Sequence, residues 1–380
     1  MKKLKVMTIL GTRPEIIRLS RVMERLDRYT DHVIVHTGQN WDYELNDIFF
    51  EDLNVRKPDH FLGVGGGSLG EVLGMILSKT EVVLLKEKPE AVLILGDTNS
   101  SISAIIARRL RIPVYHMEAG NRSFDRNVPE ETNRRLVDHI ADFNLVYTEH
   151  ARRHLISEGL EHRRINLTGS PMREVLDYYR NQIEGSDILK RLELKPKRYF
   201  IVSLHREENV DNPERLTALV FTLNKLVKKY NYPVIVSIHP RTRKLLNSLK
   251  LNFSKGVLDS KPFGFHDYNC LQMNSFCAIS DSGTIAEESS ILGFPAVTPR
   301  DAIERPEAID QGSIIITGLN PDTILAGIET ITKAFSERET IGLEKLVPTD
   351  YCIANTSERV VNLIVGTARL SNHWDGIRTF

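Results

Sequence analysis

The sequence predicts an α/β protein with two parallel β-sheets. Short apolar runs that are typical of buried strands alternate with longer amphipathic runs that are typical of helices, which is the pattern of βαβ units. The alternation occurs in two separate series along the chain. A chain of 380 residues, of which 41% are hydrophobic, is also long enough to form two hydrophobic cores. We therefore expect two domains.

The first series fills the N-terminal half of the chain. Thr12 and Glu15 form a capping-box pattern around Pro14, and the apolar residues that follow recur with the 3.6-residue period of a helix. The remaining elements are predicted from the alternation of apolar runs. The expected strands are 5–10, 32–36, 91–95, 112–115 and 143–147, and the expected helices are 15–26 and 102–109.

The second series begins after the segment TGSP at 168–171. A polar segment around 180–198 joins the two series, so the boundary is expected near 170 to 190. We place an N-terminal domain at 1–175, a C-terminal domain at 176–365 and a tail at 366–380. The expected strands of the second series are 199–204, 233–238, 276–280 and 296–298, and its expected helices are 214–229 and 285–292.

Composition excludes several classes of function. Lys plus Arg and Asp plus Glu both total 50, so no net charge would attract the protein to nucleic acid or to an acidic membrane. Cys270, Cys277 and Cys352 lack the spacing of a disulfide framework, a zinc site or a redox motif, which fits a reducing cytoplasm. The first apolar run is too short for a signal peptide, and no run is long enough to span a membrane.

Two carboxylates follow neighbouring buried strands. Asp97, in the sequence GDTN, comes after the strand expected at 91–95, and Glu118, in HMEAG, comes after the strand expected at 112–115. In open α/β sheets ligands bind beyond the carboxyl ends of the strands. Paired carboxylates at that edge indicate acid/base chemistry on a bound small molecule.

A third carboxylate is expected near the other two. Glu130 and Glu131 begin a probable helix, and each has an arginine four residues later, at Arg134 and Arg135. Such spacing alone is typical of a surface ion-pair ladder. The alternative is that the short loop after Glu118 returns Glu130 to the same cleft, where a third carboxylate would keep one group protonated as general acid catalysis requires.

The C-terminal series also ends its strands with polar residues. His205 follows the strand 199–204, and the run DSGT at 281–284 lies between a strand and a helix, where backbone N–H groups and the helix dipole favour a diphosphate. Glu288 is placed to accept hydrogen bonds from ribose hydroxyl groups, and Arg305 adds a cationic side chain for the phosphate. The alternative for Ser282 is a simple helix cap. If the two sheets face each other, these strand ends form one interdomain cleft.

Two further patterns carry little weight. The match G-x-G-x-x-G at 65–70 has no long strand before it and no acidic partner about 20 residues later, so we expect a flexible loop rather than a dinucleotide site. His116 and Glu118 are two residues apart, but no third ligand accompanies them. We therefore expect no metal.

Taken together, the motifs resemble those of the non-hydrolysing UDP-N-acetylglucosamine 2-epimerase family. The resemblance runs in order from residue 4 to about 320, and the ordered set is specific although each motif alone is weak. The motifs are GTRPE at 11–15, TGQ at 37–39, GDT at 96–98, HMEAG at 116–120, PEE-x-NRR at 129–135, HRE at 205–207, DSG at 281–283 and ERPE at 304–307.

The resemblance implies a fold, a reaction and a set of site residues. The fold is two Rossmann-like domains of the glycosyltransferase-B type, with the catalytic carboxylates in the first domain and the UDP site in the second. The reaction inverts C2 of a UDP-linked 2-acetamido sugar without a cofactor: the C2 proton is removed, UDP leaves by anti elimination, and UDP adds back after reprotonation on the other face. The family's catalytic positions fall on Asp97, Glu118, Glu130 and His205, and its nucleotide-sugar positions fall on Arg13, Arg18, Arg134, Tyr268, Ser282, Gly283, Thr284, Glu288 and Arg305.

Within the family, the chain looks most similar to the subgroup that converts UDP-2-acetamido-2,6-dideoxy-β-L-talose to UDP-N-acetyl-L-fucosamine for capsule or O-antigen, part of lipopolysaccharide. The segments that carry this similarity are GTRPEIIRLS at 11–20, HTGQNWDY at 36–43, GDTNS at 96–100 and HREENVD at 205–211. Two departures from the family are Arg18 in place of the usual Lys and Tyr268 in place of Phe. A third is NWDY at 40–43, which replaces a family stretch that contains His, Arg and Glu. This third change argues against the allosteric UDP-sugar site of some members.

Several rival functions share these motifs. The nearest is epimerisation of UDP-N-acetylglucosamine to the manno isomer, followed by a hydrolysing epimerase that releases the free sugar. A glycosyltransferase of the same fold would show no C2 exchange, and a UDP-sugar sensor would not need the three carboxylates, all of which are present. The family resemblance also implies a homodimer.

Overall fold

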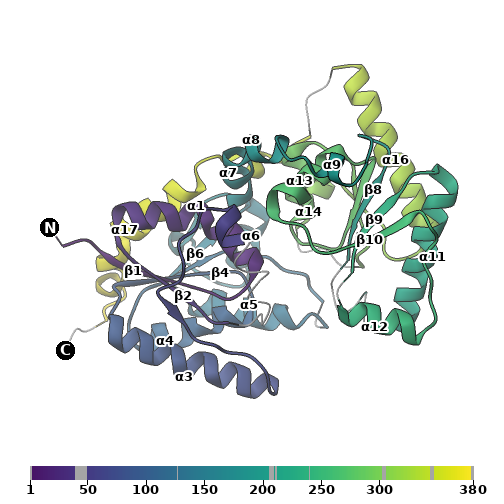
Figure 1. Cartoon of the computed structure of the whole chain (residues 1–380). Coiled ribbons are helices and arrows are strands. Elements are labelled where there is room, and N and C mark those ends of the chain that lie inside the picture. Colours follow the sequence, from purple (N-terminus) through teal and green to yellow (C-terminus); the bar gives the residue numbers. More distant parts are fainter. Residues whose placement is uncertain are drawn as a thin grey trace. The chain divides into compact units, whose positions relative to one another are not determined.

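The computed structural model describes residues 2–38, 49–125, 127–204, 209, 212–238, 240–301, 305–342 and 346–377. The chain divides into two compact units. The first unit is Met1–Asp177 together with Thr349–Phe380, and the second is Tyr178–Pro348 (Figure 1).

This division corrects the predicted domain at 176–365 and the predicted tail at 366–380, because the end of the chain belongs to the first unit. Helix α17 (Thr356–Trp374) packs against α1 (Arg13–Tyr29). Helix α17 buries Val360, Val361 and Ile364, so its apolar side completes the core of the first unit. No local signal in the sequence shows which of two domains such an amphipathic helix covers.

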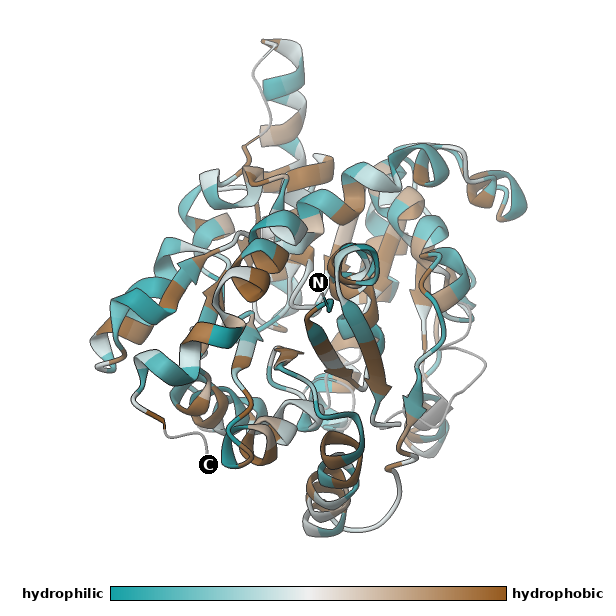
Figure 2. Cartoon of the chain, turned by 90° about the vertical axis from the view of Figure 1, so that its left-hand side faces the viewer, coloured by the Kyte–Doolittle hydropathy of each residue, from teal (hydrophilic) through white to brown (hydrophobic). Residues whose placement is uncertain are grey.

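The first unit contains a seven-stranded parallel sheet with the order β3-β2-β1-β4-β5-β6-β7. The order reverses between β1 and β4, and ligands of open α/β sheets bind at such a point, beyond the carboxyl ends of the strands. Figure 2 shows the strands near the N-terminus in hydrophobic colours, as expected for a sheet covered on both faces. The strands are β1 (Lys5–Leu10), β2 (Asp31–His36), β3 (His60–Phe61), β4 (Ala91–Leu95), β5 (Val114–Met117), β6 (Phe143–Val146) and β7 (Ile165–Leu167).

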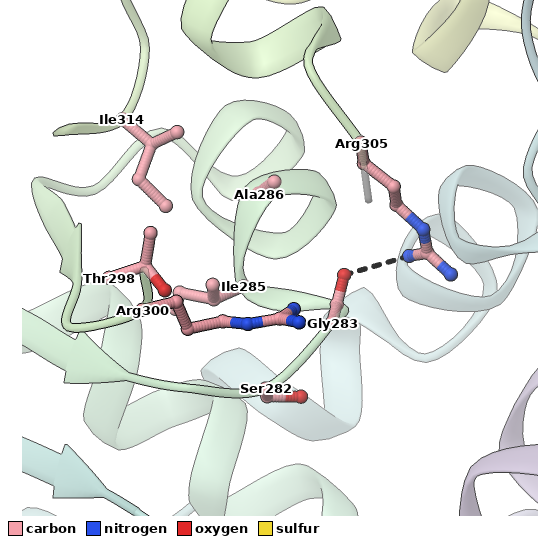
Figure 3. A pocket seen from close by; sticks show the side chains of 8 residues that line it. All are labelled: Ser282, Gly283, Ile285, Ala286, Thr298, Arg300, Arg305 and Ile314. Atoms are coloured by element: carbon pink, nitrogen blue, oxygen red, sulfur yellow. Dashed lines mark hydrogen bonds between the residues drawn. The ribbon is translucent and has the colours of Figure 1, made fainter. Parts of the chain in front are cut away.

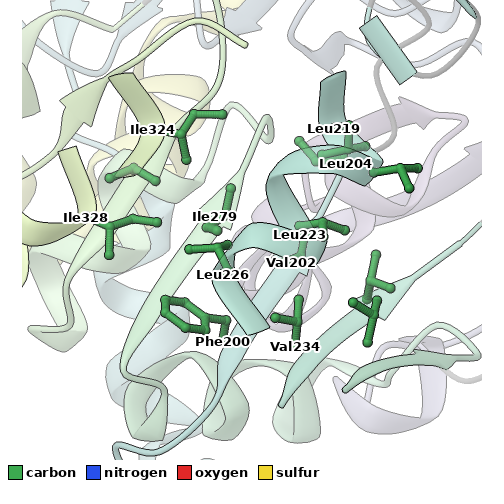
Figure 4. Packing of buried hydrophobic residues seen from close by; sticks show 14 of the residues in the cluster. Phe200, Val202, Leu204, Leu219, Leu223, Leu226, Val234, Ile279, Ile324 and Ile328 are labelled. Atoms are coloured by element: carbon green, nitrogen blue, oxygen red, sulfur yellow. The ribbon is translucent and has the colours of Figure 1, made fainter. Parts of the chain in front are cut away.

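The second unit contains a six-stranded parallel sheet with the order β10-β9-β8-β11-β12-β13. Its order reverses between β8 and β11. Helix α11 (Pro213–Tyr230) packs Leu219, Leu223 and Leu226 into a buried cluster with side chains of the strands (Figure 4). The strands are β8 (Phe200–Ser203), β9 (Val234–Ser237), β10 (Val257–Ser260), β11 (Cys277–Ser280), β12 (Ala296–Thr298) and β13 (Ile315–Ile316).

Helices cover both sheets. In the first unit they are α1, α3 (Leu69–Glu87), α4 (Ala104–Arg109), α5 (Pro129–Ile140), α6 (Glu149–Ser157) and α17, with α7 (Pro171–Tyr178) ending at the boundary. In the second unit they are α8 (Arg180–Glu184), α9 (Ile188–Arg191), α11 (Pro213–Tyr230), α12 (Pro240–Ser248), α13 (Phe265–Asn274), α14 (Ile285–Leu292), α15 (Glu307–Asp310) and α16 (Pro321–Thr340). Short 3₁₀ turns are η1 (Asn99–Ser103), η2 (His162–Arg164) and η3 (Thr349–Cys352). Among the described residues, no helix has the length and apolar composition to cross a membrane.

Two local predictions need correction. Strand β5 runs from Val114 rather than from 112, because Pro113 has no N–H to donate and only its carbonyl accepts, from Val92. The glycine-rich segment 65–70 is not wholly a loop: Ser68 and Glu71 form a capping box, and α3 begins at Leu69, so Gly70 is helical.

Candidate active site

The turns after β1 and β4 meet where the strand order of the first sheet reverses. Gly11, which follows β1, lies so close to Thr37 that an added Cβ would come within 2.1 Å of the Thr37 hydroxyl oxygen. Gly96, which follows β4, has a φ of +70°, a conformation that glycine adopts without strain. These glycines allow the chain to turn tightly and bring Asp97 to the carboxyl edge of the sheet.

Asp97 is held by helix α5. The Arg134 guanidinium forms an ion pair with the Asp97 carboxylate, and Arg134 is almost fully buried. The Asn133 side-chain amide donates to the backbone carbonyl of Asp97 over 3.0 Å and to the side chain of Asn99 over 3.1 Å. Two consecutive residues of α5 therefore fix both the backbone and the carboxylate of Asp97.

Glu118 is held in an unusual backbone conformation. It follows β5 directly with a φ of +66°, in the left-handed region that costs a bulky residue about 1–3 kcal/mol. Its carboxylate is buried and forms an ion pair with Arg18 of α1. The carboxylate also lies beside Gly96, because an added Cβ on that glycine would lie 3.9 Å from Glu118 Oε2. The structure thus brings the predicted residues Arg18 and Glu118 together next to the turn that carries Asp97.

Glu130 and Glu131 have different environments. Glu130 is exposed in the first turn of α5, whereas Glu131 is buried. Glu131 accepts from Ser123 and forms ion pairs with Arg134 at 2.9 Å and Arg135 at 3.0 Å. Of the surface ion-pair ladder that the spacing is typical of, the structure therefore forms the pair between Glu131 and Arg135. Arg134, in contrast, is turned inward to Asp97 rather than lying on a solvated face.

A buried network of charges lies behind Glu118, and the sequence analysis did not predict it. His116 donates from Nε2 to the carbonyl of Gly96 over 2.8 Å, and its Nδ1 lies 2.9 Å from Asp138 Oδ1. Asp138 accepts from the backbone N–H of Gly120 and from Arg122, which also binds Glu158 through two hydrogen bonds. Arg122 lowers the pKa of the Glu158 carboxyl to about 2. The network ties both ends of the loop around Glu118 to α5 and α6.

Glu15 also has a role that its sequence position did not reveal. The predicted capping box is not formed, because Thr12 makes no side-chain cap. Glu15 instead accepts from the N–H of Gly11, from the hydroxyl of Thr12 and from the hydroxyl of Ser100. Burial raises the pKa of the Glu15 carboxyl from 4.5 to about 7, despite these hydrogen bonds.

The raised pKa predicts a pH-dependent stability. Between pH 4.5 and 7 folded Glu15 holds a proton that the unfolded chain releases, so its contribution to stability falls as pH rises through this window. Glu15→Gln cannot ionise. We expect the free energy of unfolding of Glu15→Gln, relative to the natural protein, to increase by about 3 kcal/mol from pH 5 to pH 8. Urea denaturation at both pH values measures this difference, and a difference that is independent of pH would contradict the assignment.

The second unit has a pocket beyond the carboxyl ends of β11 and β12. Ser282 and Gly283 follow β11, and with Ile285 and Ala286 of α14 they form one side of the pocket (Figure 3). Thr298, Arg300, Arg305 and Ile314 complete the lining. The predicted cap is not formed by Ser282: the N-cap of α14 is Thr284, and the Ser282 hydroxyl accepts from the Thr284 N–H over 3.3 Å.

Two buried arginines line this pocket. Arg305 donates to the carbonyl of Gly283 over 2.8 Å (Figure 3). It also forms an ion pair with the buried Glu287. Arg300 was missed by the sequence analysis, although it follows β12 and the same strand-end argument applies to it. Cationic side chains beside the start of a helix favour a bound phosphate or diphosphate.

Glu288 and Tyr268 belong to the same unit. Glu288 is buried in the first turn of α14 and accepts from the Gln272 side chain over 2.8 Å. Burial and the nearby Glu288 raise the pKa of the Tyr268 hydroxyl well above its usual range, so this group stays a neutral donor or acceptor. Tyr268 and Glu288, both expected at the nucleotide sugar, therefore lie on neighbouring helices, α13 and α14.

The structure groups the predicted site residues by unit. The first unit holds Arg13, Arg18, Asp97, Glu118, Glu130 and Arg134, and the second holds Tyr268, Ser282, Gly283, Thr284, Glu288 and Arg305. Arg13 begins α1, with its guanidinium 5.4 Å from the ring of Phe49. His205 and the stretch 40–43 lie outside the described residues. No three His, Cys, Asp or Glu side chains within the described ranges are grouped to hold a metal ion.

Comparison with known proteins identifies the class. The family model described as UDP-N-acetylglucosamine 2-epimerase matches residues 24–365. A protein of that name from Methanococcus maripaludis is 40% identical over 87% of this chain and 92% of its own length. A UDP-2,3-diacetamido-2,3-dideoxy-D-glucuronate 2-epimerase from Pseudomonas aeruginosa is 35% identical over 86% of this chain and 92% of its own.

Solved structures agree. A UDP-N-acetylglucosamine 2-epimerase from Rickettsia bellii has a TM-score of 0.90 and 44% identity, covering 99% of this chain and 100% of its own. An enzyme from Methanocaldococcus jannaschii in complex with UDP-GlcNAc and UDP has a TM-score of 0.87 and 36% identity, covering 96% of this chain and 100% of its own. The fold and these comparisons identify a UDP-sugar 2-epimerase of the non-hydrolysing type, with two Rossmann-like domains as predicted. The chain belongs to the UDP-N-acetylglucosamine 2-epimerase family.

Proposed function

We propose that the protein interconverts UDP-N-acetylglucosamine and UDP-N-acetylmannosamine by inversion at C2. The observation that carries this proposal is the arrangement in the first unit, where Asp97 and Glu118 follow adjacent strands and each carboxylate is held by a buried arginine. Carboxylates fixed in this way are suited to remove and return a proton, because their orientation does not have to be acquired during the reaction.

The proposed reaction has two stages. In the first, a carboxylate takes the proton from C2 while the bond between C1 and the UDP oxygen breaks, which leaves a 2-acetamidoglycal with a C1–C2 double bond. In the second, UDP bonds again to C1 and a carboxylic acid gives a proton to the opposite face of C2. Asp97, Glu118 and Glu130 are the proposed acids and bases, with His205 near the leaving diphosphate.

The second unit is proposed to bind UDP. Arg305 and Arg300 offer cationic groups to the diphosphate beside Ser282 and Gly283. The Glu288 carboxylate accepts hydrogen bonds from the hydroxyl groups of the ribose. Arg13, Arg18, Arg134, Tyr268 and Thr284 are proposed as further contacts by their positions in the motifs. The assignment is supported by the pocket at the start of α14, where backbone and arginine donors meet.

UDP-N-acetylglucosamine is preferred over the talose substrate that the motifs first favoured. Two archaeal relatives, 40% and 39% identical to this chain, carry the former name, and the P. aeruginosa relative is named for a third UDP-sugar. UDP-2-acetamido-2,6-dideoxy-β-L-talose remains the second candidate, on the segments shared with that subgroup, and would connect the protein to capsule or O-antigen synthesis. Both candidate substrates carry an acetamido group at C2, where the reaction occurs, and they differ elsewhere on the sugar.

Substrate choice is tested by offering the three UDP-sugars separately and identifying the products by NMR and mass spectrometry. We expect UDP-N-acetylglucosamine to be turned over with the highest kcat/KM, with UDP-N-acetylmannosamine as product. Turnover of the talose compound alone would transfer the assignment to the second candidate. Release of free sugar and UDP would indicate a hydrolysing enzyme, and product that forms only with an acceptor would indicate a glycosyltransferase.

A cytoplasmic homodimer is also proposed. Helix α3 buries Ile76, Val83 and Leu84 in the first core but leaves Leu69, Val82 and Leu85 largely exposed. An apolar outer face on a helix is typical of an interface.

A further inference from the structure

Glu15 is a buried acid that has no part in the proposed reaction. It lies in the first turn of α1 and only 1% of its surface is exposed. Carboxyl groups are almost never buried to this extent unless partners compensate them. The partners of Glu15 come from two turns: the turn between β1 and α1, and the 3₁₀ turn η1, which directly follows Asp97 and Thr98.

One carboxyl oxygen holds the first turn. Oε2 accepts from the backbone N–H of Gly11 over 3.0 Å and from the hydroxyl of Thr12 over 2.8 Å. These contacts satisfy the N–H of Gly11 and the hydroxyl of Thr12, which makes no side-chain cap of its own on α1.

The other carboxyl oxygen holds the second turn. Oε1 accepts from the Ser100 hydroxyl over 2.8 Å, and that hydroxyl lies 2.5 Å from the hydroxyl of Thr98. Thr98 follows Asp97 directly. The chain of hydrogen bonds from Glu15 therefore ends one residue from a proposed catalytic carboxylate.

The same helix also reaches the second carboxylate. Arg18 lies three residues after Glu15, on the same side of α1, and forms the ion pair with Glu118. One rigid helix thus contacts the Asp97 turn through Glu15 and the Glu118 side chain through Arg18. We propose that Glu15 is a positioning residue that sets the Asp97 turn relative to Glu118 through helix α1. This inference rests on the proposed function, because the positions of these two acids matter only for a reaction that uses both.

A carboxyl group suits the position because it accepts from three donors at once. Alanine would leave these buried donors without their acceptor. Glutamine keeps one carbonyl oxygen for Gly11 and Thr12, and its amide can donate to Ser100 once that hydroxyl rotates toward Thr98. Glutamine should therefore rescue much of what alanine loses.

The test compares Glu15→Ala, Glu15→Gln and the natural protein by kcat, KM, UDP affinity and thermal unfolding. A misplacement of about 1 Å can cost about 100-fold in rate. We expect Glu15→Ala to lower kcat on the order of 100-fold, with UDP affinity within a few fold, and Glu15→Gln to recover at least about tenfold of that loss. Glu24→Ala is the control: Glu24 lies on the same helix, in surface ion pairs with Arg21 and Arg28, and should leave kcat unchanged.

A second variant covers the case in which Glu15→Ala does not fold. Ser100→Ala removes only the contact toward Asp97 and keeps those to Gly11 and Thr12, so it should lower kcat by about tenfold in a folded protein. Full kcat in Ser100→Ala or Glu15→Ala would overturn the inference, as would a parallel loss of UDP affinity. A natural protein that fails to turn over any UDP-sugar would instead contradict the proposed function, and the inference with it.

Discussion

Glu118→Gln is expected to lower turnover by at least about 100-fold while UDP affinity stays within a few fold. The substitution keeps the size of the side chain and one oxygen for Arg18, but it removes the group that exchanges a proton. Asp97→Asn should behave in the same way, because Asn133 still holds its backbone carbonyl. Glu130→Gln is expected to have an effect of the same kind, since its exposed position on α5 leaves the fold unaffected.

Steady-state kinetics and isothermal titration with UDP measure both quantities. Glu161→Gln is a matched control in the same unit, because Glu161 pairs only at the surface with Arg163 in an interaction of 2.5 Å. Normal turnover in all three active-site variants would exclude the proposed chemistry. A loss of UDP affinity that matches the loss of turnover would instead indicate that these acids bind the substrate rather than transfer protons.

The largest effect on stability is expected from Arg122→Met. Arg122 is fully buried between Asp138 and Glu158, so its removal leaves two carboxylates without their shared cation. Removing one partner of a buried ion pair costs about 3–5 kcal/mol, since the remaining charge stays desolvated. We expect a decrease of this size in the free energy of unfolding, measured by urea denaturation with circular dichroism.

Arg163→Met serves as the comparison for Arg122→Met. Arg163 forms an exposed ion pair with Glu161, and such pairs contribute about 0–1 kcal/mol. If the two variants lost similar amounts of stability, the buried network behind Glu118 would not have the structural role assigned to it. Turnover of Arg122→Met should fall as well, because the network holds the loop that begins at Glu118.

Much of the fold was predictable from local patterns. Strands such as β1, β4 and β12 lie where their apolar runs predicted, because a strand buried on both faces needs a continuous apolar sequence. The place of α17 was not predictable, since an amphipathic helix fits the core of either unit equally well by its own pattern. Its assignment depends on contacts with α1, more than 300 residues away in sequence.

Part of the candidate site was also predictable from local patterns in the sequence. The carboxyl ends of parallel strands meet at one edge of a sheet, so Asp97, Glu118 and the run at 281–284 could be proposed from their positions alone, and the structure places each of them just after a strand. The partners of these groups were not, because Arg18 with Glu118 and Arg134 with Asp97 are pairings between distant segments. The buried roles of Glu15 and Arg122 also depend on side chains brought together by the fold. Each is an ionisable residue of a type that sequence patterns alone place at the surface.

The proposed function requires that the enzyme removes the proton from C2 of a UDP-linked 2-acetamido sugar. The most direct measurement is proton NMR of the purified protein in D₂O with UDP-N-acetylglucosamine. We predict that the C2 proton signal decays as deuterium enters, and that C2-deuterated UDP-N-acetylmannosamine appears. Failure of C2 to exchange, with this sugar and with the talose compound alike, would contradict the account.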